Sequence, residues 1–283
     1  MNKTSIIIDE IIINALKEDI GTGDVTTSTT IPEDKKVTGR FIAKEDGVIC
    51  GLDICERVFK ILDEKIEFTV NKKDGESVKD GEIIGVVSGN ARNVLTAERT
   101  AINLLQRMSG IATQTSKAVA QVKLSGTKAK IADTRKTTPG LRALEKYAVK
   151  TGGGINHRFN LADGILIKDN HIAAAGGIIN AVECARANAP HTLKIEVECE
   201  TMKDVEDAVA AKADIIMLDN MSNEDMKKAV GFIGGRAITE ASGNMGDKDL
   251  RAAAETGVDI ISIGAITHSV RSLDISLKFV LEE

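Results

Sequence analysis

Six short apolar runs recur through the C-terminal part of the chain, and each is followed by polar or glycine residues and then by a stretch of helical composition. Continuous β-branched runs of this kind are typical of strands that are buried on both faces of a parallel sheet. Their alternation with helical stretches predicts βα repeats. The six runs are AKIAD (129–133), GILIKD (164–169), LKIEVE (193–198), DIIMLD (214–219), AITEAS (237–242) and DIISIG (259–264).

Six or seven βα units suffice for a closed α/β barrel, and an open doubly wound sheet is the alternative. No GxGxxG pattern follows the first run, which disfavours the dinucleotide-binding form of the open sheet. The helices between the runs are expected at about 172–189, 201–211, 223–231 and 247–256. The sequence therefore predicts an α/β fold whose main body is an α/β barrel of six to seven parallel strands.

The first hundred residues have a different texture. Residues 5–18 carry a helical stripe of apolar side chains, and from about 36 to 90 short β-like runs are separated by three Asp-Gly pairs that signal turns. A helical stretch follows, with Ser109-Gly110 as a possible break. We therefore expect an N-terminal α+β sandwich domain over 1–110 and the barrel domain over 111–268.

Composition narrows the range of partners. The 37 Lys and Arg against 42 Asp and Glu give a net charge of −5, and aromatic residues make up 2% of the chain. A mildly acidic chain is a poor candidate for wrapping DNA, and few aromatics argue against stacking on single strands. No apolar run approaches the ~20 residues that cross a bilayer, and the four cysteines lack disulfide density. We expect a cytoplasmic protein with no nucleic-acid or membrane partner and with small anionic ligands.

Charged or phosphate-suited residues end the six runs. Because loops at the carboxyl ends of the strands carry the chemistry in α/β barrels, we expect these residues to form one site. Between residues 130 and 171 eight Lys or Arg stand against four acids, a local +4 that leaves −9 for the rest. Guanidinium groups match carboxylates and lysines act as point charges. The candidate ligands for a small dianion are Arg135, His157, Arg158 and Lys168.

Two carboxylates, Glu198 and Asp219, end neighbouring runs. Mg²⁺ prefers one or two carboxylates together with water and substrate phosphates, so a diphosphate bridged by Mg²⁺ fits this pair. Charge balance against the basic residues is the alternative. Ser242-Gly243 and Gly264 precede helices, so their backbone N–H groups are suited to a terminal phosphate. His268 follows the second of these turns and could donate to the same phosphate.

Taken together, the longest motifs resemble the quinolinate phosphoribosyltransferase family, from about residue 18 to 270. One departure from the family pattern is Asn244, which stands where many relatives have a glycine. The segments that carry the resemblance are EDIGTGDVTT (18–27), ERTAINLLQRMSGIAT (98–113), DTRKTTPGLRALEKYAVKTGGGINHR (133–158), ADGILIKDNHI (162–172), IEVECET (195–201), IIMLDNM (215–221), EASGNM (240–245) and GVDIISIGAITHS (257–269).

The resemblance implies an activity, a cofactor and a partner. The reaction would transfer the phosphoribosyl group of phosphoribosyl diphosphate to quinolinate with loss of CO₂, giving nicotinate mononucleotide and diphosphate in NAD synthesis, with Mg²⁺. The resemblance also implies a homodimer in which Arg99 of one protomer completes the neighbour's site. It further implies that a C-terminal helix, 269–283, returns to the N-terminal domain.

The same likeness implies roles for individual residues. Quinolinate would be held by Arg99, Arg135, His157, Arg158 and Lys168. The diphosphate, Mg²⁺ and catalysis would be served by Lys136, Glu198 and Asp219. Phosphoribosyl diphosphate would also contact Ser242, Gly243, Gly264 and His268.

Two other interpretations stay open at this point. A lysine at a strand end is the usual position of a Schiff-base lysine, so Lys168 also fits an aldolase-like barrel. The second alternative is a non-catalytic, anion-binding relative that has kept the fold. The intact set of basic and acidic residues at the strand ends argues against this second alternative.

Overall fold

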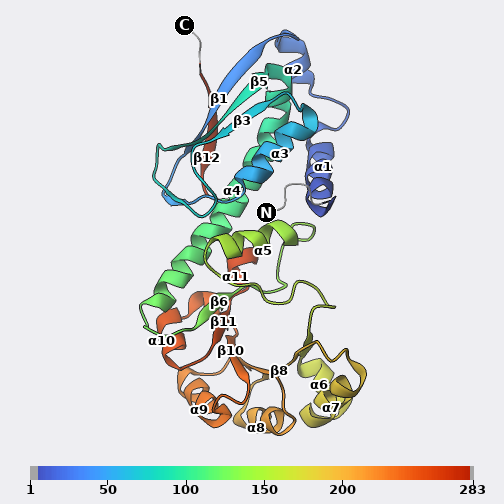
Figure 1. Ribbon diagram of the computed structural model, residues 1–283, viewed down its shortest axis with the longest axis vertical. Coiled ribbons are helices and arrows are strands. Elements are labelled where there is room, and N and C mark those ends of the chain that lie inside the picture. The colour runs from blue at the N-terminus through green and yellow to red at the C-terminus, as the bar shows by residue number, and fades with distance from the viewer. Residues whose placement is uncertain (1–5, 281–283) are drawn as a thin grey trace. The chain divides into compact units, whose positions relative to one another are not determined.

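A computed structural model describes residues 6–280 of the chain, and these residues divide into two compact units (Figure 1). The first unit runs to Ser116 and also takes in Thr138–Gly152 and the segment from Val270 onward. The second unit consists of Lys117–Thr137 and Gly153–Ser269. Each unit therefore contains segments that are far apart in the sequence.

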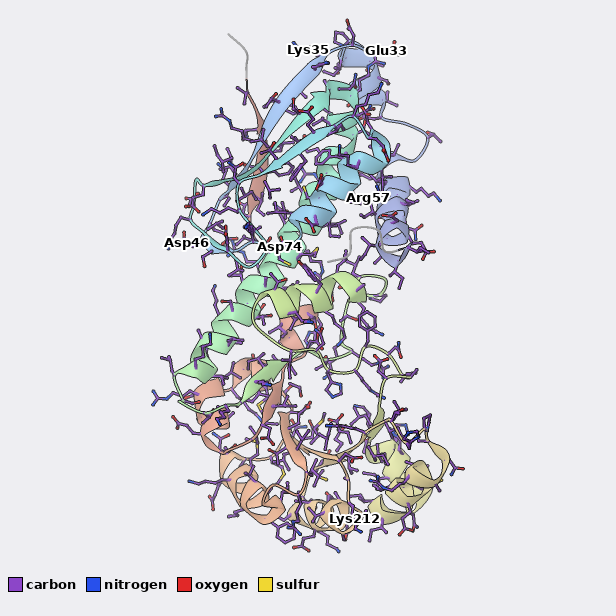
Figure 2. The ribbon with its side chains drawn as sticks, in the orientation of Figure 1. Glu33, Lys35, Asp46, Arg57, Asp74 and Lys212 are labelled. Atoms are coloured by element: carbon purple, nitrogen blue, oxygen red, sulfur yellow. The ribbon has the colours of Figure 1, made fainter. Side chains whose placement is uncertain are left out.

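The segment Thr138–Gly152, which contains helix α5 (Arg142–Thr151), clusters with the first unit rather than with the barrel, where we expected it. Polar contacts explain this placement. Arg107 donates to the Glu145 carboxylate at 2.7 Å. The Tyr147 hydroxyl donates at 2.9 Å to Asp74, which is labelled in Figure 2. Asp74 also accepts from the backbone N–H groups of Gly51 and Leu52, where helix α3 (Leu52–Leu62) begins.

An antiparallel sheet in the order β12–β1–β5–β3 is the centre of the first unit. Helix α1 buries a stripe at i, i+4 and i+8, namely Ile8, Ile12 and Leu16. The expected N-terminal α+β domain is confirmed. The strands of this unit are β1 (Lys36–Ala43), β2 (Gly47–Val48), β3 (Glu67–Val70), β4 (Ser77–Val78), β5 (Ile83–Asn90) and β12 (Ile275–Phe279), and its helices besides α5 are α1 (Ile6–Ile20), α2 (Val25–Thr30), α3 (Leu52–Leu62) and most of α4 (Ala91–Lys123).

The prediction of a C-terminal helix over 269–283 was wrong. Residues 275–279 form strand β12, which pairs antiparallel with β1, with Leu277 opposite Phe41. The physical reason is a period of two: Ile275 and Leu277 are buried, while the residues between and after them are more exposed. The last residues of the expected helix, 281–283, lie outside the described part of the chain.

Helix α4 continues through Ser109-Gly110, where we expected a possible break. Gly110 has a packing role, because a Cβ there would collide with the backbone of Arg271. The Ser109 hydroxyl accepts from the backbone N–H of Cys50 at 3.0 Å. Both residues therefore allow other parts of the first unit to approach the helix closely.

The second unit is a parallel sheet of six strands in the order β6–β11–β10–β9–β8–β7. From β7 to β11 the chain moves round the sheet in one direction, and the first strand, β6, lies beside the last. That order is typical of a barrel and not of a doubly wound sheet, so the predicted α/β barrel is confirmed. The strands are β6 (Lys130–Ala132), β7 (Ile165–Ile167), β8 (Ile195–Cys199), β9 (Ile215–Asp219), β10 (Ile238–Ser242) and β11 (Ile260–Ser262).

Short helices connect the barrel strands, and side chains cap several of them. Thr201 and Asp204 form a capping box at the start of α8, and Ser222 and Asp249 cap α9 and α10. The helix expected over 172–189 is divided at Gly176-Gly177, both of which have positive φ. The helices are α6 (Asp169–Ala175), α7 (Ile178–Asn188), α8 (Met202–Ala210), α9 (Asn223–Ile233), α10 (Leu250–Glu255), α11 (Ala265–His268) and the 3₁₀ turn η1 (Met245–Asp247).

Within residues 6–280, every helix is too short or too polar to span a lipid bilayer.

Phe59→Ala should lower the free energy of unfolding by about 3–5 kcal/mol, the usual cost of truncating a buried phenylalanine. Phe59 is fully buried and lies with its ring centroid 6.1 Å from each of Phe41 and Phe68. Denaturant unfolding followed by circular dichroism measures the loss. Phe232→Ala, which truncates a phenylalanine that is 42% exposed, is the matched control. Equal losses in the two variants would contradict the packing described here.

Candidate active site

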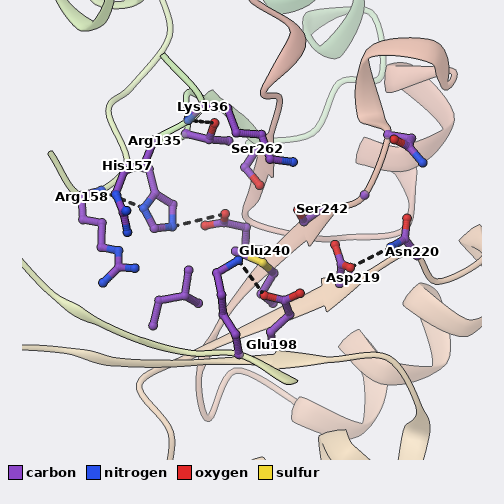
Figure 3. A pocket seen from close by; sticks show the side chains of 16 residues that line it. Arg135, Lys136, His157, Arg158, Glu198, Asp219, Asn220, Glu240, Ser242 and Ser262 are labelled. Carbon is purple, nitrogen blue, oxygen red and sulfur yellow. Dashed lines mark hydrogen bonds and ion pairs between the residues drawn. The ribbon is translucent and has the colours of Figure 1, made fainter. Parts of the chain in front are cut away.

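A cavity of ≈ 400 Å³ opens at the carboxyl ends of the barrel strands (Figure 3). All of its lining residues belong to the second unit, and most lie in a strand or directly after one. Both basic side chains and carboxylates line the cavity. The lining residues are Thr134, Arg135, Lys136, His157, Arg158, Leu166, Lys168, Glu198, Met217, Asp219, Asn220, Glu240, Ser242, Gly243, Asn244 and Ser262.

Asp133 positions the basic part of the wall. It is fully buried at the end of β6, and its carboxylate accepts from the backbone N–H of His157 at 2.9 Å and from the amide of Asn156 at 2.6 Å. These two hydrogen bonds fix the position of Asn156 and His157, at the end of the glycine-rich segment, relative to strand β6. Arg158 is fixed in turn, because its guanidinium donates to the Gly164 carbonyl at 2.8 Å.

The guanidinium groups of Arg135 and Arg158 influence each other. Burial lowers the pKa of Arg158, the positive charge of Arg135 lowers it further, and the carboxylate of Glu196 opposes the shift. Two cationic groups that repel each other in a partly buried wall are stabilised when an anion lies between them. The structure thus brings the sequence-predicted residues Arg135, His157 and Arg158 together in the lining of one cavity.

Lys168 and Glu198 form an ion pair in the opposite part of the wall, with Lys168 Nζ 3.3 Å from Glu198 Oε2. Glu198 Oε2 is buried and has no hydrogen-bond partner in the described part of the chain. Asp219, on the next strand, accepts from the amide of Asn220 at 2.7 Å. The ion pair joins Lys168, at the end of β7, to the neighbouring strand β8.

The loop after β10 contains two consecutive residues with left-handed backbone conformations. Gly243 has φ +89, and a Cβ at this position would collide with Asn220. Asn244 also has a left-handed conformation, with φ +51. Asparagine tolerates this conformation better than most residues, so the departure from the family glycine preserves the backbone path. Ser242, Gly243 and Asn244 all line the cavity.

Three sequence-predicted residues lie outside the cavity lining. A Cβ on Gly264 would lie 2.9 Å from Lys136 Cδ and 3.1 Å from His268 Cδ2, so these three residues are neighbours. Lys136 lines the cavity, but Gly264 and His268 do not. Arg99 belongs to the first unit, where it is exposed on α4.

Two buried glutamates, Glu240 in the cavity lining and Glu196 near it, were not given a role from the sequence. Glu196 of β8 and Glu240 of β10 lie beside His157. Burial and the nearby charge of Glu196 raise the pKa of Glu240 to about 7, and Asp133 adds to the shift, while His157 and a hydrogen bond from Ser262 oppose it. The available signal was the period of two in β8, because Glu196 and Glu198 must then share one face.

The fold and this cavity define a phosphoribosyltransferase-type barrel, and comparison with known protein families agrees. The model of the quinolinate phosphoribosyl transferase C-terminal domain matches residues 111–278, and that of the N-terminal domain matches residues 24–109. The chain belongs to the quinolinate phosphoribosyltransferase family.

Individual relatives support this membership over almost the whole chain. A probable carboxylating nicotinate-nucleotide pyrophosphorylase of Bacillus subtilis is 47% identical over 93% of this chain and 90% of its own length. The nicotinate-nucleotide pyrophosphorylase structures from Francisella tularensis and Ehrlichia chaffeensis are each 43% identical, with TM-scores of 0.91 and 0.92. They cover 97% and 99% of this chain and 96% and 100% of their own chains.

Glu240→Gln should raise the thermal unfolding midpoint at pH 8 relative to the wild type, and the difference should shrink towards pH 5.5. The pKa of Glu240 is about 7 in the folded protein against an ordinary 4.5. A carboxyl whose pKa is raised by folding stabilises the fold fully below the unfolded value and loses that contribution as the pH rises through the folded value. Glutamine carries no charge to bury at pH 8.

Differential scanning calorimetry at both pH values measures this effect. Glu206→Gln makes the same chemical change at an exposed position on α8 and should leave the midpoint unchanged at both. If the difference between Glu240→Gln and the wild type is independent of pH, Glu240 does not titrate in this range.

Proposed function

We propose that the 400 Å³ cavity is the active site at which this chain, a carboxylating nicotinate-nucleotide pyrophosphorylase, makes nicotinate mononucleotide for NAD synthesis. The substrates are quinolinate and phosphoribosyl diphosphate, and the other products are diphosphate and CO₂. One observation carries the proposal: paired guanidinium groups and paired carboxylates share one cavity at the strand ends of a barrel of this family. The catalytic domain in this proposal is the second unit, Lys117–Thr137 and Gly153–Ser269, and the protein is expected to be cytoplasmic.

Quinolinate carries two adjacent carboxylates on a pyridine ring, and the basic wall offers matching charge. Arg135 and Arg158 would bind the carboxylates, with Lys168 as a third cationic group and His157 beside them. Bound carboxylates would relieve the repulsion between the two guanidinium groups. The scarcity of aromatic residues agrees with a site that holds the ring by charge and arginine geometry.

Phosphoribosyl diphosphate would lie across the other side of the cavity. The N–H groups of the Ser242-Gly243 turn are suited to its 5-phosphate, and Gly264 and His268 would complete that site next to Lys136. Lys136 would direct its charge to the diphosphate. Because Gly264 lacks a side chain, Lys136 and His268 can approach each other there.

The carboxylates of Glu198 and Asp219 fit a magnesium ion. Glu198 Oε2 is buried, and apart from its ion pair with Lys168 it has no hydrogen-bond partner in the described residues; Asp219 lines the same cavity from the neighbouring strand. One or two carboxylates plus substrate oxygens are the ligands that Mg²⁺ prefers. When bound, the ion would supply positive charge for the departing diphosphate.

The protein needs no nucleophile of its own for this chemistry. As diphosphate departs, positive charge develops at the ribose C1, and the pyridine nitrogen captures that carbon. The resulting pyridinium withdraws electrons from the adjacent carbon, which releases CO₂ and accepts a proton. Arg135 and Arg158 hold the ring in place, and Lys136 stabilises the negative charge of the leaving group. Fixed charges of this kind supply most of the assistance.

Arg135→Ala should lower kcat/KM for quinolinate about 30-fold or more, because removing one partner of a buried charge pair costs roughly 2–5 kcal/mol. The assay follows CO₂ from carboxyl-labelled quinolinate with and without phosphoribosyl diphosphate and Mg²⁺. Release should require both additions. Arg251→Ala, at an exposed position on α10, is the matched control and should retain full activity. Absence of CO₂ release by the wild type would refute the function, and full activity of Arg135→Ala would refute the assigned pocket.

We also infer that the active form is a homodimer in which Arg99 of one protomer binds quinolinate in the site of the other. Family resemblance suggests this role, and Arg99 is exposed on its helix, as an intersubunit ligand must be in a single chain.

Mixing inactive Arg99→Ala and Arg135→Ala proteins should restore activity, because one of the two sites in a mixed dimer then contains both arginines. A maximum of about one quarter of wild-type turnover is expected, since half of the dimers are mixed and each has one intact site. Activity after mixing, unfolding and refolding together measures the effect. If Arg99→Ala alone retains wild-type activity, or mixing restores none, the shared site is wrong.

A further inference from the structure

Three ionisable side chains meet at His157, two of them in the cavity lining, and the proposed reaction gives the two glutamates among them no task. His157 Nε2 lies 3.1 Å from Glu196 Oε2 and 3.6 Å from Glu240 Oε1. The side chains are 12%, 5% and 2% exposed, respectively. Figure 3 shows the His157 ring pointing at the carboxylate of Glu240. Burying a carboxylate costs folding free energy unless the carboxylate is paired with a charge or accepts hydrogen bonds.

The hydrogen bond at Nδ1, the ring nitrogen that faces away from the glutamates, identifies the tautomer of His157. The backbone N–H of Arg158 donates to His157 Nδ1 at 2.8 Å. A nitrogen that accepts a hydrogen bond must offer a lone pair, so Nδ1 carries no proton. The ring proton then lies on Nε2, the nitrogen that faces the two glutamates.

His157 is consequently held at three points. Its backbone N–H donates to Asp133, its Nδ1 accepts from the backbone of Arg158, and its Nε2–H is directed at the glutamates. The Glu240 carboxylate accepts a hydrogen bond from Ser262, but its buried Oε1 atom, 3.6 Å from His157 Nε2, has no hydrogen-bond partner in the described residues. The second carboxylate is therefore available to share the imidazole proton with Glu196.

We propose that Glu196 and Glu240 are positioning residues, which hold His157 as the neutral Nε2–H tautomer and fix its ring in the wall of the carboxylate cavity. The proposal rests on the proposed function and changes one assignment within it. His157 supplies a fixed surface beside Arg158 and is not a cationic ligand of quinolinate. The charge that binds the substrate then comes from Arg135, Arg158 and Lys168.

The same three residues resemble a metal site, because one ligand atom from each lies within 4.8 Å of the others. A metal would need a lone pair on the histidine nitrogen that faces the carboxylates. The N–H of Arg158 is aimed at the other nitrogen and places the proton on the facing one. The geometry therefore favours a shared proton over a metal ion.

The tautomer can be measured directly, without turnover. In protein labelled with ¹⁵N-histidine, long-range ¹H–¹⁵N correlation spectra distinguish the two neutral tautomers and the imidazolium. His157, assigned by its disappearance in His157→Gln, should show a protonated Nε2 and an unprotonated Nδ1 at pH 7. An imidazolium, the Nδ1–H tautomer, or one-to-one Zn²⁺ binding that is lost in Glu240→Gln would overturn the proposal.

Kinetics tests whether this arrangement matters for the reaction. Glu196→Gln keeps an oxygen that can accept from Nε2–H, whereas Glu196→Ala removes it. Glu196→Ala should lower kcat/KM for quinolinate roughly 10- to 100-fold, by analogy with the loss that follows removal of the carboxylate partner of a metal-binding histidine. Glu196→Gln should recover most of this loss, and KM for phosphoribosyl diphosphate should change little in both.

Controls separate the possible failures. Glu206→Gln, exposed on α8, should behave as the wild type. If Glu196→Ala does not fold, Glu240→Gln, which preserves shape, is examined for the tautomer of His157 instead. A folded Glu196→Ala variant with wild-type kinetics would overturn the positioning role. Inactive wild-type protein would refute the proposed function, while the tautomer measurement would still decide the arrangement at His157.

Discussion

The junction between β6 and the segment around His157 is the constraint on which the site depends. Ile155 pairs with Ala132 as an isolated parallel bridge, and the Ile155 N–H donates to Ile131 at 2.8 Å. The residue after Ala132 is Asp133, and its buried carboxylate accepts from the backbone N–H of His157. A segment rich in glycine, with no regular structure of its own, thereby acquires a register against the barrel. Without these contacts, His157 and Arg158 would have no defined position relative to the strand ends.

Charge balance explains why the site is stable without substrate. Arg135 and Arg158 are two cationic groups of one cavity, and the carboxylate of Glu196 opposes the fall in the pKa of Arg158. This nearby negative charge reduces the repulsion between the two guanidinium groups. A dianionic ligand can therefore still lower the free energy of the guanidinium groups. A chain with a net charge of −5 can therefore form a site for anions, because the basic residues are concentrated in one cavity and carboxylates lie close to them.

The predictable parts of the fold were those with local signals. Continuous apolar runs indicated the six barrel strands, because a strand buried on both faces needs apolar residues throughout. Errors came where local and tertiary signals differ. The C-terminal segment is too short to show its period clearly, and its pairing with β1 decides in favour of a strand. Gly110 looks like a helix break in the sequence, but the structure requires it for close packing inside a continuous helix.

For the site, the sequence by itself determined which charged residues end the strands, and hence that anion ligands and cation ligands meet at one end of the barrel. Tertiary structure alone decided how they are connected. The ion pair of Lys168 with Glu198, and the approach of Glu196 and Glu240 to His157, join residues from different strands. Such contacts depend on strand order and register, which no local pattern encodes. The tautomer of a histidine likewise depends on which N–H faces its ring.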